Sequence, residues 1–136
     1  MLKYEVLPVT PFMQNCSLVW CEETRDAALI DPGGEMAHLL KAVADRGLQL
    51  KAVWLTHGHL DHVGAADEIR QQTGCPIIGP QRADAFWLEG LPAQSSMFGF
   101  PLTESFAPDR WLESGDILEL GTEQVSVLHC PGHTPG

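Results

Sequence analysis

The stretch Thr56-His57-Gly58-His59-Leu60-Asp61-His62-Val63-Gly64 decides how this sequence is interpreted. Three imidazoles and a carboxylate so close together would be costly to crowd without a cation. His57 and His59 are two apart in an extended segment, so they can point to the same side and chelate one ion. Asp61 and His62 lie where a helix is expected to start, so they can reach a second ion. Imidazole nitrogen and carboxylate oxygen without thiolate suit Zn²⁺, Fe²⁺ or Mn²⁺.

The residues around this stretch alternate between strand and helix patterns. Spacing of i, i+3, i+4 and i+7 predicts an amphipathic helix over residues 35–47, a second helix runs on from the histidine stretch to Gly74, and a third over 84–89 is expected to bury Phe86 and Trp87. Apolar runs predict strands at residues 4–7, 16–20, 27–30, 51–55 and 76–78, and a hairpin over 117–128 with a Gly-Thr turn. The first three strands are expected to form an antiparallel meander. The fold class is therefore α/β (α+β).

The segment 90–110 shows no clear period, although it carries several apolar residues. Long loops in a compact domain are uncommon and often functional, so a lid or substrate wall is one interpretation. We favour the other, an irregular segment that its aromatic side chains pack onto the core.

Composition excludes several classes of function. The 136 residues fit a single domain, 1–136, and the net charge of −10 without a basic cluster argues against binding nucleic acid. No apolar run is long enough to cross a membrane, and Pro8 and Pro11 interrupt the region where a signal peptide needs an apolar stretch. We therefore expect a cytoplasmic protein. Its four cysteines form no CxxC pair and are expected to be small buried hydrophobic residues.

The second informative stretch is Leu128-His129-Cys130-Pro131-Gly132-His133-Thr134-Pro135-Gly136. Its glycines and prolines predict a tight irregular turn after a strand, which places His133 at a sheet edge as the third nitrogen ligand of the first ion. His129 continues the strand pattern and is expected to pack. Cys130 is expected to be a buried thiol rather than a ligand, and His38 a surface residue.

Three stretches together resemble successive motifs of the metallo-β-lactamase superfamily, and most of all its glyoxalase II-like hydrolases. They are residues 56–64, Pro-Gly-His-Thr-Pro-Gly at 131–136 and Leu-Ile-Asp-Pro-Gly-Gly at 29–34. The resemblance implies an αββα sandwich, of which this chain supplies the N-terminal half and the start of the second half. It also implies that His57, His59 and His133 bind the first metal and that Asp61 and His62 bind the second, with Asp61 also essential to catalysis. Asp31 would orient the metal loop, residues 56–64, without binding an ion itself.

The sequence departs from the family pattern at its end. Members of the family are longer, and they contribute a bridging aspartate and a last histidine from segments beyond the Pro-Gly-His motif. We favour the interpretation that this sequence is the N-terminal part of a longer protein, so that its domain is incomplete; the alternative is a naturally reduced relative. As given, the first ion has three protein ligands and the second has two.

For a complete protein, the resemblance implies a zinc-dependent hydrolase of thioesters such as S-D-lactoylglutathione, with two Zn²⁺ per site and Fe or Mn as alternatives. A hydroxide between the two ions would attack the carbonyl carbon. The partner would be a small-molecule thioester. Competing hypotheses are a mononuclear iron persulfide dioxygenase, a tRNA 3′-processing nuclease, which the acidic charge disfavours, and an inactive metal-binding fragment. The histidine directly after Asp61 is expected to disfavour antibiotic hydrolysis.

Overall fold

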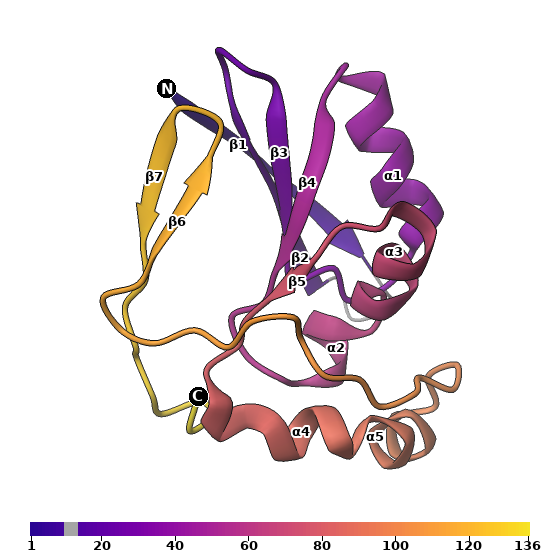
Figure 1. Cartoon of the computed structure of the whole chain (residues 1–136). Coiled ribbons are helices and arrows are strands. Elements are labelled where there is room, and N and C mark those ends of the chain that lie inside the picture. The colour runs from indigo at the N-terminus through magenta and orange to yellow at the C-terminus, as the bar shows by residue number, and fades with distance from the viewer. Residues whose placement is uncertain (10–13) are drawn as a thin grey trace.

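Five strands form the main sheet in the order β1-β2-β3-β4-β5 (Figure 1). They are β1 (Leu2–Val9), β2 (Gln14–Cys21), β3 (Asp26–Ile30), β4 (Gln49–Trp54) and β5 (Ile77–Ile78). The first three pair antiparallel, as the predicted meander requires, whereas β3 with β4 and β4 with β5 pair parallel. The computed structural model describes residues 1–9 and 14–136, so Pro11, which argued against a signal peptide, lies outside the described part.

Helices α1 (Met36–Asp45) and α3 (Ala66–Thr73) lie on one face of the sheet (Figure 1). The predicted helix over 35–47 is α1. The second predicted helix is in fact two, because α2 (Leu60–Val63) ends before α3 begins. At this break the backbone N–H of Ala65 donates to the carbonyl of Pro32 at 2.9 Å, which gives it a partner in the turn after β3.

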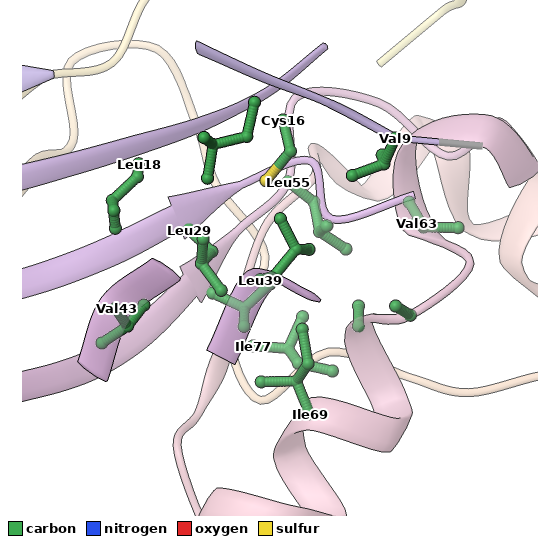
Figure 2. Close-up of a cluster of buried hydrophobic side chains, with 14 of the residues drawn as sticks. Val9, Cys16, Leu18, Leu29, Leu39, Val43, Leu55, Val63, Ile69 and Ile77 are labelled. Carbon is green, nitrogen blue, oxygen red and sulfur yellow. The ribbon is translucent and has the colours of Figure 1, made fainter. Parts of the chain in front are cut away.

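Alternate residues of the central strands face two separate apolar layers, as the two-residue period of a strand requires. Leu29 and Val53 face α1 and α3 and belong to the larger core, parts of which are drawn in Figure 2. Ala28 and Trp54 face the other way and pack with residues beyond the sheet. Both faces of β3 and β4 are therefore covered, which suits strands that pair in parallel.

The second apolar layer is closed by a hairpin of β6 (Ile117–Leu120) and β7 (Glu123–Ser126), which lies across the sheet from the helices (Figure 1). Leu118 and Leu120 are buried there against Trp54 and Ala28. The layers thus run helices, sheet, hairpin, and the predicted mixed α/β fold is confirmed.

The segment expected to be irregular contains a helix. A single turn η1 (Arg82–Asp84) leads into α4 (Ala85–Glu89), and α5 (Leu91–Phe98) follows directly. Only Leu91 and Ser95 of α5 are buried, so its apolar residues show no helical period in the sequence. The prediction that Phe86 is buried was also wrong, because its side chain is 50% exposed.

Three of the four cysteines are buried as predicted: Cys16, Cys21 and Cys75. Cys130 is exposed instead, because β7 ends at Ser126 and the chain beyond it leaves the hairpin. Among the described residues, no helix is long and apolar enough to cross a membrane.

Candidate metal centre

The histidine stretch begins where β4 ends, at the carboxyl edge of the parallel part of the sheet. Leu55 is buried and its backbone N–H donates to the carbonyl of Ile78 at 2.9 Å, so the strand pairing continues up to the first residue of the loop. The loop then enters α2, which lies at the same end of the sheet as the C-terminus of the chain (Figure 1). This is the edge at which α/β sheets present ligand-binding side chains.

His57, His59 and His133 form one cluster, with one nitrogen of each lying within 4.8 Å of the others. Nδ1 of His59 is 3.2 Å from Nε2 of His133. Each pair of rings meets edge to face, at interplanar angles of 84–87°. The structure thus brings together three histidines that are up to 76 positions apart in the sequence.

A chain of hydrogen bonds fixes the orientation of His57. Thr56 donates its hydroxyl hydrogen to Oδ2 of Asp31 at 2.5 Å, which leaves its Oγ1 to accept from Nδ1 of His57 at 2.9 Å. With its hydrogen on Nδ1, the ring presents the lone pair of Nε2 to the cluster. That Nε2 is buried and has no hydrogen-bond partner among the described residues. An orphaned buried acceptor facing two other imidazoles fits a metal ligand.

The protonation of the cluster points the same way. Burial, together with the nearby His62, lowers the pKa of His57 to about 4, and burial also lowers the pKa of His59. Both rings are therefore neutral at pH 7. Because a metal binds the lone pair of a neutral imidazole, the donor set fits Zn²⁺ or a related divalent ion.

Asp31 supports the metal loop from beneath. It is 6% exposed, and its Oδ1 also accepts the backbone N–H of Thr56 at 2.8 Å. Its Oδ2 lies 3.0 Å from Nδ1 of His62. Burial alone would lower the pKa of His62, but the hydrogen bond and charge of Asp31 outweigh it and raise that pKa.

The residues expected at the second ion, Asp61 and His62, are adjacent but are not gathered as closely as the first set. Oδ2 of Asp61 lies 3.7 Å from Nε2 of His62. Nδ1 of His62 faces Asp31, so Nε2 is the ring nitrogen that is available to bind a metal ion together with Asp61. The second three-residue group within 4.8 Å is Asp31, His57 and His62, and among the described residues Asp61 belongs to neither group.

Two residues that were not predicted to belong to this site, Gln94 and Trp87, help to position it. Gln94 of α5 accepts the backbone N–H of Leu60 at 3.0 Å and donates to the carbonyl of Trp87 at 2.8 Å. The Trp87 ring packs edge to face on His59, with centroids 4.6 Å apart. No local sequence signal marks the contacts with Leu60 and His59, because they join segments that are about thirty positions apart.

The other candidate residues of the two stretches are placed as follows. His38 is exposed, as predicted. His129 is exposed rather than packed, since it lies beyond β7, and its Nε2 is 2.9 Å from the carbonyl oxygen of Pro135. Neither His129 nor Cys130 belongs to the groups of potential ligands found in the described residues.

Two hollows flank the first cluster. One of about 330 Å³ lies beside His57 and His133, with Trp54 and Leu118 among its walls. The other, of about 270 Å³, lies beside His59 and Asp61 and is walled by aromatic side chains. Their size is near the lower end of small-molecule sites.

Comparison with known proteins places this geometry in a family. The sequence profile described as the metallo-beta-lactamase superfamily matches residues 9–136, almost the whole chain. The chain belongs to the metallo-beta-lactamase superfamily. The resemblance that rested on three short motifs is therefore confirmed, and so is the fold it implied.

Among individual relatives, the chain is 48% identical over 136 residues to hydroxyacylglutathione hydrolase GloC of Haemophilus influenzae, covering 99% of this chain and 64% of that protein. Among solved structures, BLEG-1, a B3 metallo-beta-lactamase, matches with a TM-score of 0.85 and 31% identity over 98% of this chain and 64% of that one. TTHA1623 in a di-iron-bound form matches with a TM-score of 0.83 and 33% identity over 97% and 63%. The chain thus spans less than two thirds of each of these relatives.

Proposed function

We propose that this chain carries the metal site of a thioester hydrolase that acts on S-D-lactoylglutathione or a related acyl thioester. The single observation that carries the proposal is the convergence of His57, His59 and His133 at the end of β4. The 48% identity to a hydroxyacylglutathione hydrolase supports the substrate class. The partner is then a small-molecule thioester, and we further propose that residues 1–136 all belong to one domain of a cytoplasmic protein.

In this proposal His57, His59 and His133 hold the first Zn²⁺, while Asp61 and His62 contribute to a second. Zinc bound in such a site supplies a nucleophilic water at neutral pH and polarises the substrate carbonyl. The residues of the chain hold and orient: Thr56 and Asp31 fix His57, and Asp31 fixes His62 with Nε2 turned toward Asp61. The two hollows beside the cluster offer space for the acyl part and the thiol part of a thioester substrate.

A zinc titration of the purified chain tests the ligand assignment. We expect the double variant His57→Ala/His59→Ala to lose most zinc binding. The matched control is His38→Ala/His129→Ala, which also removes two histidines but both are exposed and outside the cluster. Unchanged affinity in the first double variant, or an equal loss in the control, would contradict the assignment.

An activity assay tests the substrate class. The product of the complete reading frame, whatever its length, should hydrolyse S-D-lactoylglutathione in a chelator-sensitive manner, and Asp61→Ala should lower the rate more than it lowers binding of the first metal. Activity that is absent, or that is insensitive to chelator, would contradict the substrate class and leave a metal-binding protein.

A second candidate, β-lactam hydrolysis, is favoured by the likeness to BLEG-1, although His62 was expected to disfavour it. A chromogenic cephalosporin assayed beside the thioester decides between the two. The likeness to a di-iron protein makes iron the metal to measure next to zinc. Iron content with persulfide-dependent oxygen consumption would identify a persulfide dioxygenase instead.

A further inference from the structure

Asp84 is a fully buried carboxylate that the metal-ligand assignment does not use. It is 0% exposed and ends η1 directly before α4. An aspartate at such a position usually caps its own helix by accepting a backbone N–H from the first turn. The side chain of Asp84 makes no such bond to α4. Its partners lie elsewhere.

The three hydrogen-bond donors of Asp84 come from the two segments that carry the histidine cluster. Oδ2 accepts the backbone N–H of Gly58 at 2.9 Å and the hydroxyl of Thr134 at 2.8 Å. Oδ1 accepts the backbone N–H of Gly136 at 2.6 Å. Gly58 lies between His57 and His59, and Thr134 directly follows His133. One side chain therefore bridges residues that directly adjoin all three histidines.

Two glycines allow this close approach. A Cβ on Gly136 would lie 2.7 Å from Cγ of Asp84, and a Cβ on Gly58 would lie 2.8 Å from Cβ of Trp87. Both distances are shorter than real Cβ contacts. A side chain at either position would push its segment away from Asp84, so the Gly-His-Thr-Pro-Gly and His-Gly-His patterns suit the bridge as well as the ligands.

The His133 turn, residues 131–136, depends on these contacts with Asp84 for its position. His133 itself is exposed, whereas Thr134 is 5% exposed and points to the carboxylate. Burying a carboxylate is costly in free energy unless hydrogen-bond donors compensate it. Both oxygens of Asp84 accept hydrogen bonds, and all of these come from the metal loop and the His133 turn.

We propose that Asp84 is a positioning residue that holds the His133 turn against the metal loop and so completes the three-histidine site. This inference rests on the proposed metal site, but the position of His133 can be measured without metal. The metal-free chain should show NOEs between the ring protons of His59 and His133, since the rings lie 4.8 Å apart between centroids. Asp84→Asn should lose these NOEs.

The second readout is zinc affinity, which Asp84→Asn should weaken about 10- to 100-fold, as loss of an outer partner of a ligand typically does. The matched control is Asp109→Asn, which removes a carboxylate that accepts the backbone N–H of Ile77 at 2.8 Å away from the cluster. That control should keep both the NOEs and the affinity. An equal loss in the control would show that Asp84 acts only through general stability, and would overturn the inference.

A milder pair of variants covers the case in which Asp84→Asn does not fold. Thr134→Val removes the hydroxyl but keeps the shape, whereas Thr134→Ser keeps the donor. We expect Thr134→Val to lose NOEs and zinc affinity and Thr134→Ser to retain them. NOEs that survive in both Asp84→Asn and Thr134→Val overturn the inference, whether or not zinc binds. A wild-type chain that shows the NOEs but binds no zinc would instead contradict the proposed function alone.

Discussion

The loop that carries His57 and His59 and the turn that carries His133 are supported in different ways. The loop leaves a buried strand, enters α2, and is fixed by Asp31 and Gln94 as well as by Asp84, which it shares with the turn. The turn follows the last residues of the hairpin and is mostly exposed; its link to the loop runs through Thr134 and Gly136.

This difference shows that one site can be built partly by the core and partly by a few polar contacts. Substitutions of the residues that support the loop should lower both the stability of the fold and the affinity for metal. Changes in the turn should act mainly on metal affinity. Three variants test the support of the loop, and a fourth, away from the site, is expected to have the smallest effect.

Asp31→Ala should be the most damaging, because it removes a buried carboxylate that accepts from the N–H and the hydroxyl of Thr56 and that is the partner of His62. We expect the free energy of unfolding to fall by about 3 kcal/mol in urea denaturation, with a parallel loss of zinc affinity. The control Asp45→Ala removes only an exposed i,i+4 pair with Lys41 and should cost less than about 0.5 kcal/mol. Similar small losses in both would mean that Asp31 does not support the loop.

Gly33→Ala should come next. A Cβ at this position would lie 1.8 Å from the carbonyl oxygen of Asp61, so α2 must shift away from the turn after β3. We expect a loss of about 2 kcal/mol by thermal unfolding. In the control, Gly47→Ala, the new Cβ meets open space and only the φ of 65° is strained, so about 1 kcal/mol is expected. A larger loss at Gly47 would contradict the close packing of α2.

Gln94→Ala should cost about 1 kcal/mol of unfolding free energy, because the Leu60 N–H at the start of α2 loses its acceptor. Gln94→Glu keeps the acceptor but places a carboxylate oxygen beside the Trp87 carbonyl, so it should recover only part of that loss. Gln71→Ala, an exposed glutamine bonded to Asp67, serves as control and should be close to neutral. If Gln94→Ala unfolds like Gln71→Ala, the helix start does not depend on this contact.

The smallest effect is expected away from the site, at Asp109. The N–H of Ile77, with help from Arg70, lowers the pKa of this carboxyl group. The stability it contributes is therefore complete at neutral pH, above its unfolded pKa of about 4, and is lost as the pH falls through the lower folded value. Since the side chain is 48% exposed, the wild type should exceed Asp109→Asn by less than about 1 kcal/mol at pH 7. A difference that grows in acid would contradict this.

The sequence predicted the loop better than the turn, and the reason is physical. The strand before His57 and the helix α1 follow from local periodicity, and the histidine spacing is itself local. The predicted helix from the loop to Gly74 failed at Ala65, because the contact with Pro32 that interrupts it joins positions far apart in the chain. The prediction for α5 failed because the packing of Leu91 and Ser95 leaves no apolar stripe.

In the turn, the sequence predicted the place of His133 but not what surrounds it. His129 and Cys130 were expected inside, since the apolar pattern of β7 continues to Leu128. The strand ends at Ser126, however, and backbone hydrogen bonds to the other arm of the hairpin continue only to Val127. Asp84 is an ordinary helix-start residue in the sequence. Its contacts with Gly58 and Thr134 depend on the tertiary fold, so no local sequence pattern predicts them.

The most direct test of the account is X-ray absorption spectroscopy of the chain loaded with one equivalent of zinc. We expect three imidazole nitrogens at about 2.0–2.1 Å and no sulfur, from His57, His59 and His133. The same spectrum from His133→Ala should show two. A sulfur scatterer at about 2.3 Å would place Cys130 on the metal, and an unchanged nitrogen count in His133→Ala would remove the turn from the site; either result would contradict the account.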